Sequence, residues 1–283
     1  WWPNLLGRRN RPKHNYGIAK GRRVCCKSRV SLVIIATVTT VAVYRDQAIV
    51  LRTQKLGEAD RIITLFTKEH GRLRAVAKGV RRTKSKFGAR LEPTSYVDLQ
   101  LYAGKTFDIV TQAEGIENFG DSLATDYKNW TTANSILEAA ERFTENEHEP
   151  ALQQFNLVVG ALRALAHGTY DSSLILDAYL LRSLGVAGFA PSMTTCSKCD
   201  EPGPHNYFSL VGGGSVCVTC KPSAAATPSP ETLELMSNLM TGDWNNAVES
   251  DLRSRREASG LIAAYLQWHI ERGLRSLPLV ERI

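Results

Sequence analysis

The pattern of apolar and polar positions changes its period once along this chain, near residue 119. Before that point, short β-rich runs alternate with turn signals, and in the clearest run Val97, Leu99 and Leu101 share one face of an extended segment. Five such runs within about 75 residues predict a small closed barrel, of which the OB-fold is the nucleic-acid-binding example. The runs are 48–51, 62–66, 73–77, 96–102 and 107–112.

Beyond residue 119 the apolar residues recur at a helical spacing. Ser229, Pro230 and Glu231 combine an N-cap residue, a first-turn proline and an early acid, and therefore predict the start of a helix. The last helix is expected to run from about residue 250 to residue 276. The stretch 191–227 interrupts the helices with Gly, Pro and Ser and holds two pairs of cysteines.

These patterns predict an α+β protein of several domains. We expect an N-terminal five-stranded OB-fold barrel, followed by an all-helical domain into which a four-cysteine zinc element is inserted. The predicted boundaries are 41–119 for the OB-fold domain, 120–190 and 228–283 for the two parts of the helical domain, and 191–227 for the zinc element.

The two cysteine pairs have the spacing of a metal site. Cys196 and Cys199 form one CxxC, Cys217 and Cys220 form the other, and seventeen residues lie between them, inside the window for a four-cysteine zinc site. Four thiolates leave no open coordination position, so we expect one structural Zn²⁺ rather than a catalytic one. Disulfides, an empty site or a redox CxxC are the alternatives, and His205 is a weaker candidate ligand.

Residues 1–40 differ in composition from the rest of the chain. They hold nine Lys or Arg and no Asp or Glu, begin without Met and lead into the mostly apolar stretch 30–43. Such a segment suits a signal peptide. We favour a non-native or disordered extension, with Val41 as the true start, because a reduced zinc site argues against export. The chain from Val41 is then expected to fold and function alone.

Positive charge is concentrated before residue 91. The net charge of the whole chain is +7, but residues 41–90 hold thirteen Lys or Arg against four acids, whereas residues 121–283 hold twelve against nineteen. A basic segment on an otherwise acidic chain indicates a surface that binds a polyanion. We therefore expect the barrel at 41–119 to be a DNA-binding domain.

The densest basic stretch supplies the candidate contacts. Its cations would neutralise phosphates, and the aromatic residues Phe87, Tyr102 and Phe107 are candidates for stacking on bases. The alternatives are that the stretch is only a solvated hairpin loop and that each aromatic residue belongs to the core. The candidate DNA-binding residues are Arg72, Arg74, Lys78, Arg81, Arg82, Lys84, Lys86 and Arg90.

Several motifs that are typical of enzymes and membrane proteins are absent or incomplete in this sequence. Gly104-Lys105-Thr106 resembles the end of a phosphate-binding loop, but Leu99 stands where that motif needs glycine. An H-x-E at His269 follows both cysteine pairs, the wrong order for a zinc deaminase. No apolar run reaches the 18 or so residues of a membrane span. We expect a protein that is not an enzyme. We also expect it to be cytoplasmic and, as a DNA-binding protein, nucleoid-associated.

Residues 44–93 and the CxxC pairs at 196–220 resemble the RecO family of bacterial DNA repair proteins, and the helical remainder fits in order and length. The resemblance covers about residues 41–280. It implies an OB domain, a helical domain and a zinc element. It also implies binding of single-stranded and double-stranded DNA, annealing of complementary strands, and help in loading RecA onto strands coated by single-stranded DNA-binding protein, with RecR as partner.

Two other functions compete with this interpretation. An RNA-binding OB-fold protein with a structural zinc site would have the same barrel and the same basic loop. An enzyme that uses the cysteine site would need an open coordination position on its metal.

Overall fold

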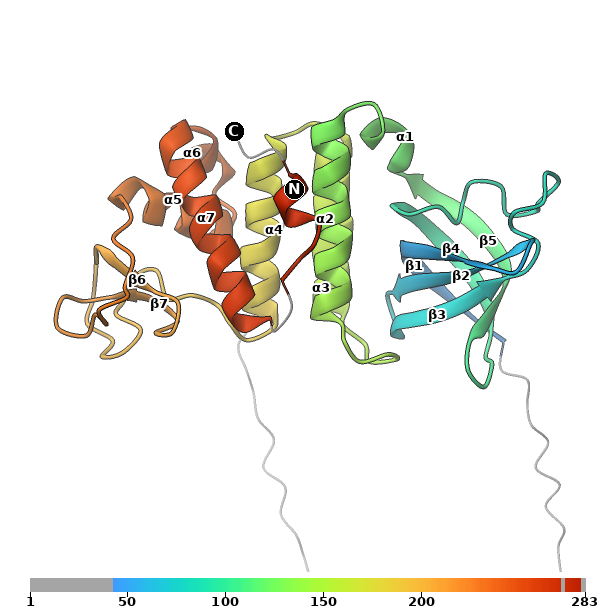
Figure 1. Cartoon of the computed structure of the whole chain (residues 1–283), viewed down its shortest axis with the longest axis horizontal. Helices are drawn as coiled ribbons and strands as arrows, with labels where there is room; N and C mark the ends of the chain where they lie inside the picture. Colours follow the sequence, from blue (N-terminus) through green and yellow to red (C-terminus); the bar gives the residue numbers. More distant parts are fainter. Residues whose placement is uncertain (1–42, 271–272, 281–283) are drawn as a thin grey trace, which may run out of the picture. The chain divides into compact units, whose positions relative to one another are not determined.

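The computed structural model describes residues 43–270 and 273–280, and these residues belong to one compact unit. The expectation for residues 1–40 lies outside the described residues. Five strands come first along the chain, and they are followed by helices and a small hairpin (Figure 1). The strands are β1 (Val43–Leu56), β2 (Asp60–Thr67), β3 (Gly71–Ala77), β4 (Ser95–Tyr102) and β5 (Asp108–Asn118).

The five strands close into a barrel in the order β1-β2-β3-β5-β4. β1 pairs antiparallel with β2 along one edge and with β4 along the other, which is possible because it is fourteen residues long and bends at a register shift between Val50 and Arg52. A short parallel pairing, Ala75 with Asp108 and Val76 with Ile109, joins β3 to β5. β1 and β5 extend furthest beyond the predicted runs, because their ends mix polar residues with isolated apolar ones such as Val43, Leu56 and Ile116 and give no continuous apolar signal.

The barrel strands face two different cores. Val50, Ile63 and Leu99 point into the barrel and belong to its interior cluster. Ile49 and Phe66 belong instead to the large cluster formed by the helices. Successive residues of a strand point to opposite faces, so one strand serves both cores.

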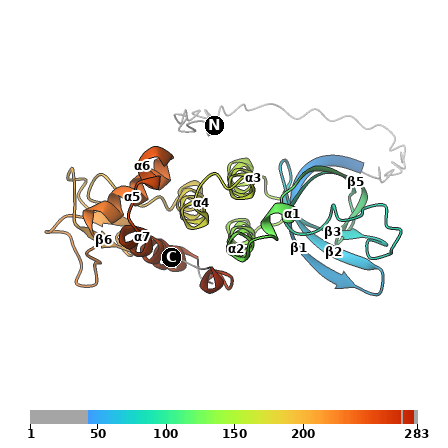
Figure 2. The same ribbon diagram turned by 90° about the horizontal axis from the view of Figure 1, so that it is seen from above.

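The helices pack around α4, whose buried residues lie on all of its faces. Figure 2 shows α2, α3 and α4 nearly end-on, with α2 and α3 nearer to the barrel. Among the described helices, none is both long and apolar enough to cross a lipid bilayer. The helices are α1 (Gly120–Leu123), α2 (Tyr127–Phe143), α3 (Leu152–Ala166), α4 (Ser172–Val186), α5 (Pro230–Thr241), α6 (Trp244–Val248), α7 (Leu252–His269) and a 3-10 turn, η1 (Leu277–Leu279).

The helix ends test two of the sequence predictions. Ser229 is the N-cap of α5, and its hydroxyl accepts a hydrogen bond from the Thr232 N–H, which confirms the predicted start. The prediction that the last helix reaches residue 276 is wrong, because Ile270 is extended and ends α7. The N–H groups of Arg275 and Ser276 instead donate to the Glu138 carboxylate on α2, at 2.9 and 2.8 Å.

The segment with the paired cysteines is a compact hairpin element between α4 and α5. Its strands are β6 (Tyr207–Ser209) and β7 (Gly214–Val216). Phe208 of β6 packs edge-on against Tyr265 of α7, with ring centroids 5.7 Å apart. This contact ties the hairpin to the helical core.

Candidate nucleic-acid interface and metal centre

The basic loop, residues 78–90, lies between β3 and β4 and is held to the barrel from both sides. Phe87 and Val80 are buried in the barrel interior cluster. The Gly79 N–H donates to the Asp60 carboxylate at 2.7 Å, and the Arg81 N–H donates to the Ala59 carbonyl at 3.0 Å. The loop therefore has a defined path, which its apolar residues anchor.

The cations of the basic loop point outward. Lys78, Arg82 and Lys84 are exposed, and in the described part of the chain none of them pairs with a carboxylate. Arg81 and Lys86 are also exposed, but each donates to a main-chain carbonyl, that of Glu58 at 2.9 Å and that of Thr111 at 2.7 Å.

Arg90 completes the set, with its guanidinium hydrogen-bonded to the carbonyl oxygens of Lys86 and Phe87. Carbonyl contacts orient these cations without cancelling their charge. The six loop cations therefore form one uncompensated positive surface.

The other two candidate cations have a different environment. Arg74 of β3 pairs with Glu147, with 2.7 Å between Nε and Oε1, and its guanidinium lies 5.0 Å from the centroid of the Phe107 ring. Arg72 donates to the main-chain carbonyls of Thr144 and Glu145 at the end of α2. Both side chains join the barrel to the helical part, so the loop cations are the more accessible to a polyanion.

The three aromatic residues that were candidates for stacking on bases also differ in their burial and contacts. The expectation that Phe87 stacks on bases is contradicted, because its side chain is 1% exposed and fills the barrel interior. Phe107 is partly exposed, but Arg74 lies against its ring. Tyr102, at the end of β4, is also partly exposed. An aromatic residue within a basic run does not reveal from sequence alone which way its ring points.

The four cysteines meet at one point of the hairpin element. The sulfur atoms of Cys196, Cys199, Cys217 and Cys220 all lie within 4.8 Å of one another, and those of Cys199 and Cys217 are 3.8 Å apart. A tetrahedron of sulfurs around zinc, with Zn–S bonds of about 2.3 Å, has edges of about 3.8 Å. The structure therefore brings the four predicted cysteines together at a spacing consistent with a zinc site.

The electrostatics of the quartet also fit a cation. Backbone N–H groups, that of Cys217 first, donate to the Cys196 sulfur and lower the pKa of this thiol to about 6. The neighbouring sulfurs, that of Cys217 first, raise the pKa of Cys220 to about 12. Several thiolates at this spacing repel one another unless a cation lies between them. His205 is not among the clustered residues, and its ring nitrogen contacts the Glu201 carbonyl at 2.9 Å.

A junction between barrel and helices was not predicted from the sequence. Phe155 of α3 packs edge-on against Phe66 and Tyr96, with centroids 5.6 and 6.0 Å away. Arg163 of α3 forms an ion pair with Glu117 of β5. These residues are far apart along the chain, and no local pattern marks them.

Comparison with known proteins gives the same two-part division. The family model described as Recombination protein O N terminal matches residues 41–119, and that described as Recombination protein O C terminal matches residues 124–278. The chain is 56% identical over 248 residues to the DNA repair protein RecO of Streptomyces coelicolor, a match that covers 86% of this chain and all of the relative.

The proteins of the same name from Streptomyces avermitilis and Thermobifida fusca are 55% and 54% identical over 248 and 242 residues, with the same coverage. Two family models together span most of the chain, and the relatives are matched over their whole length. The chain therefore belongs to the RecO family of DNA repair and recombination proteins.

Proposed function

We propose that this protein binds DNA through the basic loop and brings complementary single strands together. The observation that carries the proposal is the loop surface, where Lys78, Arg82 and Lys84 are exposed and pair with no carboxylate among the described residues. A strand of DNA supplies the phosphates that such cations attract, and released counterions favour binding to any sequence.

The barrel is proposed to be an OB-fold that serves as the DNA-binding domain, residues 41–119. Five strands in the order β1-β2-β3-β5-β4, with β1 paired on both edges, support this assignment. Residues 120–190 and 228–283 are proposed to form the helical domain, and residues 191–227 the zinc element.

The proposed activity needs no bond to be made or broken by the protein. Two DNA strands repel each other through their phosphates, and a cationic surface lowers that repulsion so that bases can pair. A protein that acts in this way binds both single-stranded and double-stranded DNA. The role in loading RecA onto strands coated by single-stranded DNA-binding protein, together with RecR, is proposed from the family to which the chain belongs.

The cysteine quartet is proposed to hold one structural Zn²⁺. Cys196, Val216 and Cys217 are the buried residues of the cluster around the quartet, a core too small to fix the element by itself. When bound, the metal would supply a crosslink between the two CxxC turns.

A strand-annealing assay tests the proposed function. Two complementary fluorophore- and quencher-labelled DNA strands are mixed with and without the protein, and again after both are coated with single-stranded DNA-binding protein. We expect faster annealing with the protein in both cases, and less acceleration as salt rises. No acceleration with either DNA would refute the proposal, and a clear preference for RNA strands of the same sequence would favour an RNA-binding function.

A further inference from the structure

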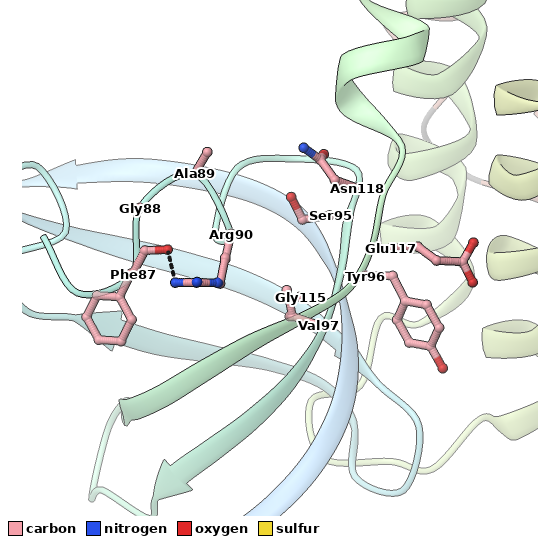
Figure 3. Close-up of a pocket in the computed structure, with 10 residues that line it drawn as sticks. All are labelled: Phe87, Gly88, Ala89, Arg90, Ser95, Tyr96, Val97, Gly115, Glu117 and Asn118. Atoms are coloured by element: carbon pink, nitrogen blue, oxygen red, sulfur yellow. Dashed lines mark hydrogen bonds between the residues drawn. The ribbon is translucent and has the colours of Figure 1, made fainter.

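A small pocket lies between the basic loop and strands β4 and β5 (Figure 3). Phe87, Arg90 and their neighbours in the loop form one side, and Ser95, Val97 and Gly115 are among the residues that form the other. Its volume is about 270 Å³, slightly below the range of about 300–1,000 Å³ typical of sites for drug-sized ligands. A pocket of this size takes one small ring, and not a whole peptide.

Glycine keeps the strand side of the pocket open. A Cβ atom built on Gly115 meets no other atom within 4 Å, and its backbone is not in the left-handed region. Neither crowding nor strain therefore requires glycine at this position of β5. Glycine inside a strand weakens it, and marks either a bulge, which β5 has between Gly115 and Glu117, or a place where a ligand approaches the backbone.

A buried hydroxyl group lines the same pocket. The Ser95 side chain is 2% exposed, and its Oγ has no hydrogen-bond partner in the described structure. Leaving a buried polar group unpaired costs stability, so such groups call for an explanation. Rotation of the Ser95 side chain about its Cα–Cβ bond would turn the hydroxyl toward the pocket, where a ligand can supply the missing partner. A hydroxyl both donates and accepts, so it can pair with the edge of any of the four bases.

Arg90 provides a flat cationic side to the pocket. Figure 3 shows its guanidinium held by the Phe87 carbonyl, the bond marked by the dashed line. Among the described residues, Arg90 has no carboxylate partner. A guanidinium plane stacks on bases and also binds phosphates. Arg82 and Lys84, exposed on the same loop, can hold the neighbouring phosphates of one strand.

We infer that this pocket receives one unstacked base of a single DNA strand bound along the basic loop. The inference rests on the proposed function and adds a base-binding subsite to it. A nucleobase fits the pocket better than an apolar side chain of a partner protein, because it is planar, carries polar edges for Ser95 and is joined to phosphates for the loop cations. The free hydroxyl of Ser95 implies little preference among bases, as annealing of arbitrary sequences requires.

Filling the pocket tests the inference. Gly115→Val adds side-chain atoms without a clash at Cβ and with a residue that favours strands. Binding is measured by fluorescence anisotropy with a thymine oligonucleotide and with an abasic strand of equal length and charge. We expect Gly115→Val to bind the thymine strand about tenfold more weakly, to bind the abasic strand as the wild type does, and to keep the same salt dependence on both.

Gly260→Leu is the matched control, because a Cβ at this exposed position of α7 also meets no atom within 4 Å. It should bind both strands as the wild type does. Unchanged binding of the thymine strand by Gly115→Val, or an equal loss on both strands, would overturn the base-binding pocket alone. Failure of the wild type to bind either strand would overturn the proposed function, and the pocket with it.

Ser95→Ala gives a second, independent measurement. Removing an unpartnered buried hydroxyl should leave the melting temperature unchanged or raise it, whereas affinity for the thymine strand should fall about fivefold. Affinity for the abasic strand should not change. A variant that is as stable as the wild type and binds the thymine strand equally well would contradict the role of Ser95 in the pocket.

Discussion

The guanidinium Nε of Arg72 donates a hydrogen bond to the main-chain carbonyl of Thr144, 2.6 Å away. Thr144 is the C-cap of α2, where helix carbonyls lack partners within the helix. Arg72 also donates to the Glu145 carbonyl, and its own carbonyl accepts from the His148 N–H at 2.8 Å. A cation of the barrel thus stabilises the end of a helix in the other part of the protein.

Arg72→Ala should therefore affect stability more than DNA binding. We expect the free energy of unfolding to fall by about 2 kcal/mol, because two carbonyls lose a charged donor, and the melting temperature to fall by about 4–8 °C. The salt dependence of DNA binding should be unchanged. Arg82→Ala is the control, because Arg82 is exposed and should behave in the opposite way. Normal stability with a flatter salt dependence in Arg72→Ala would make Arg72 a phosphate contact after all.

Gly71, next to Arg72, is expected to tolerate no side chain. Its φ is +69°, and a Cβ there would lie 1.9 Å from the Glu149 carbonyl oxygen in the loop after α2. Gly71→Ala should lower the free energy of unfolding by more than about 3 kcal/mol, because the barrel and that loop would have to separate.

Gly57→Ala is the matched variant, with a similar φ of +58° and no atom within 4 Å of its Cβ. This variant should lower the free energy of unfolding by only about 1–2 kcal/mol, because it adds backbone strain but no steric clash. Urea unfolding of the two variants measures the difference. Equal losses would show that contact with Glu149 adds nothing to the strain at Gly71.

The ion pair between Arg163 and Glu117 should make the junction sensitive to acid. The hydrogen bond from the Arg163 guanidinium holds the pKa of Glu117 below its ordinary value of 4.5. A lowered pKa contributes stability that is present above the ordinary pKa and is lost as the pH falls through the folded-state pKa. The wild type should therefore lose more stability than Glu117→Gln on going from about pH 5 to pH 3. Parallel unfolding curves of the two proteins over this range would contradict the prediction.

The cysteine quartet is expected to bind one zinc ion per chain. Cys199→Ser should lose the metal and make the 191–227 segment sensitive to protease, because folding of such an element is coupled to its metal. DNA affinity should be retained, since the basic loop lies in the barrel. Elemental analysis and thiol titration make the measurement. Protein purified without chelator that holds no zinc, and in which Cys25, Cys26 and the four cysteines of the quartet are all free thiols, would refute the site.

The basic loop should supply the salt-dependent part of DNA binding. Replacing Arg81, Arg82, Lys84 and Lys86 together by Ala should weaken binding to all sequences about equally. The slope of log affinity against log salt should fall by about 0.7 for each phosphate of a single strand that the variant no longer neutralises.

Two double variants separate phosphate binding from loop geometry. Arg82→Ala with Lys84→Ala removes unpaired cations and should leave stability unchanged. Arg81→Ala with Lys86→Ala also removes the hydrogen bonds to the Glu58 and Thr111 carbonyls, and should loosen the loop. If the quadruple variant and both double variants keep the wild-type affinity and the wild-type slope of log affinity against log salt, the loop is only a solvated surface.

The sequence by itself determined the features that depend on neighbouring residues. The alternating burial of Val97, Leu99 and Leu101 along β4, the hydroxyl cap of Ser229 and the spacing of the cysteine pairs are local, and the described structure has all three. A strand, a helix cap or a CxxC turn depends on residues that are a few positions apart in the chain. Its pattern can therefore be recognised in the sequence alone.

The tertiary structure decided which residues of a given type do which task. Lys84 and Arg72 look alike in the basic run, yet one is exposed without a carboxylate partner and the other caps a helix more than seventy residues away. Phe87 was a candidate for stacking on bases and is buried. The pocket beside Phe87 is lined by Arg90 of the basic loop and Gly115 of β5, and the whole of β4 separates these two residues in the sequence. Burial and pairing depend on which distant residues meet, and a count of charges or apolar positions along the chain does not contain that information.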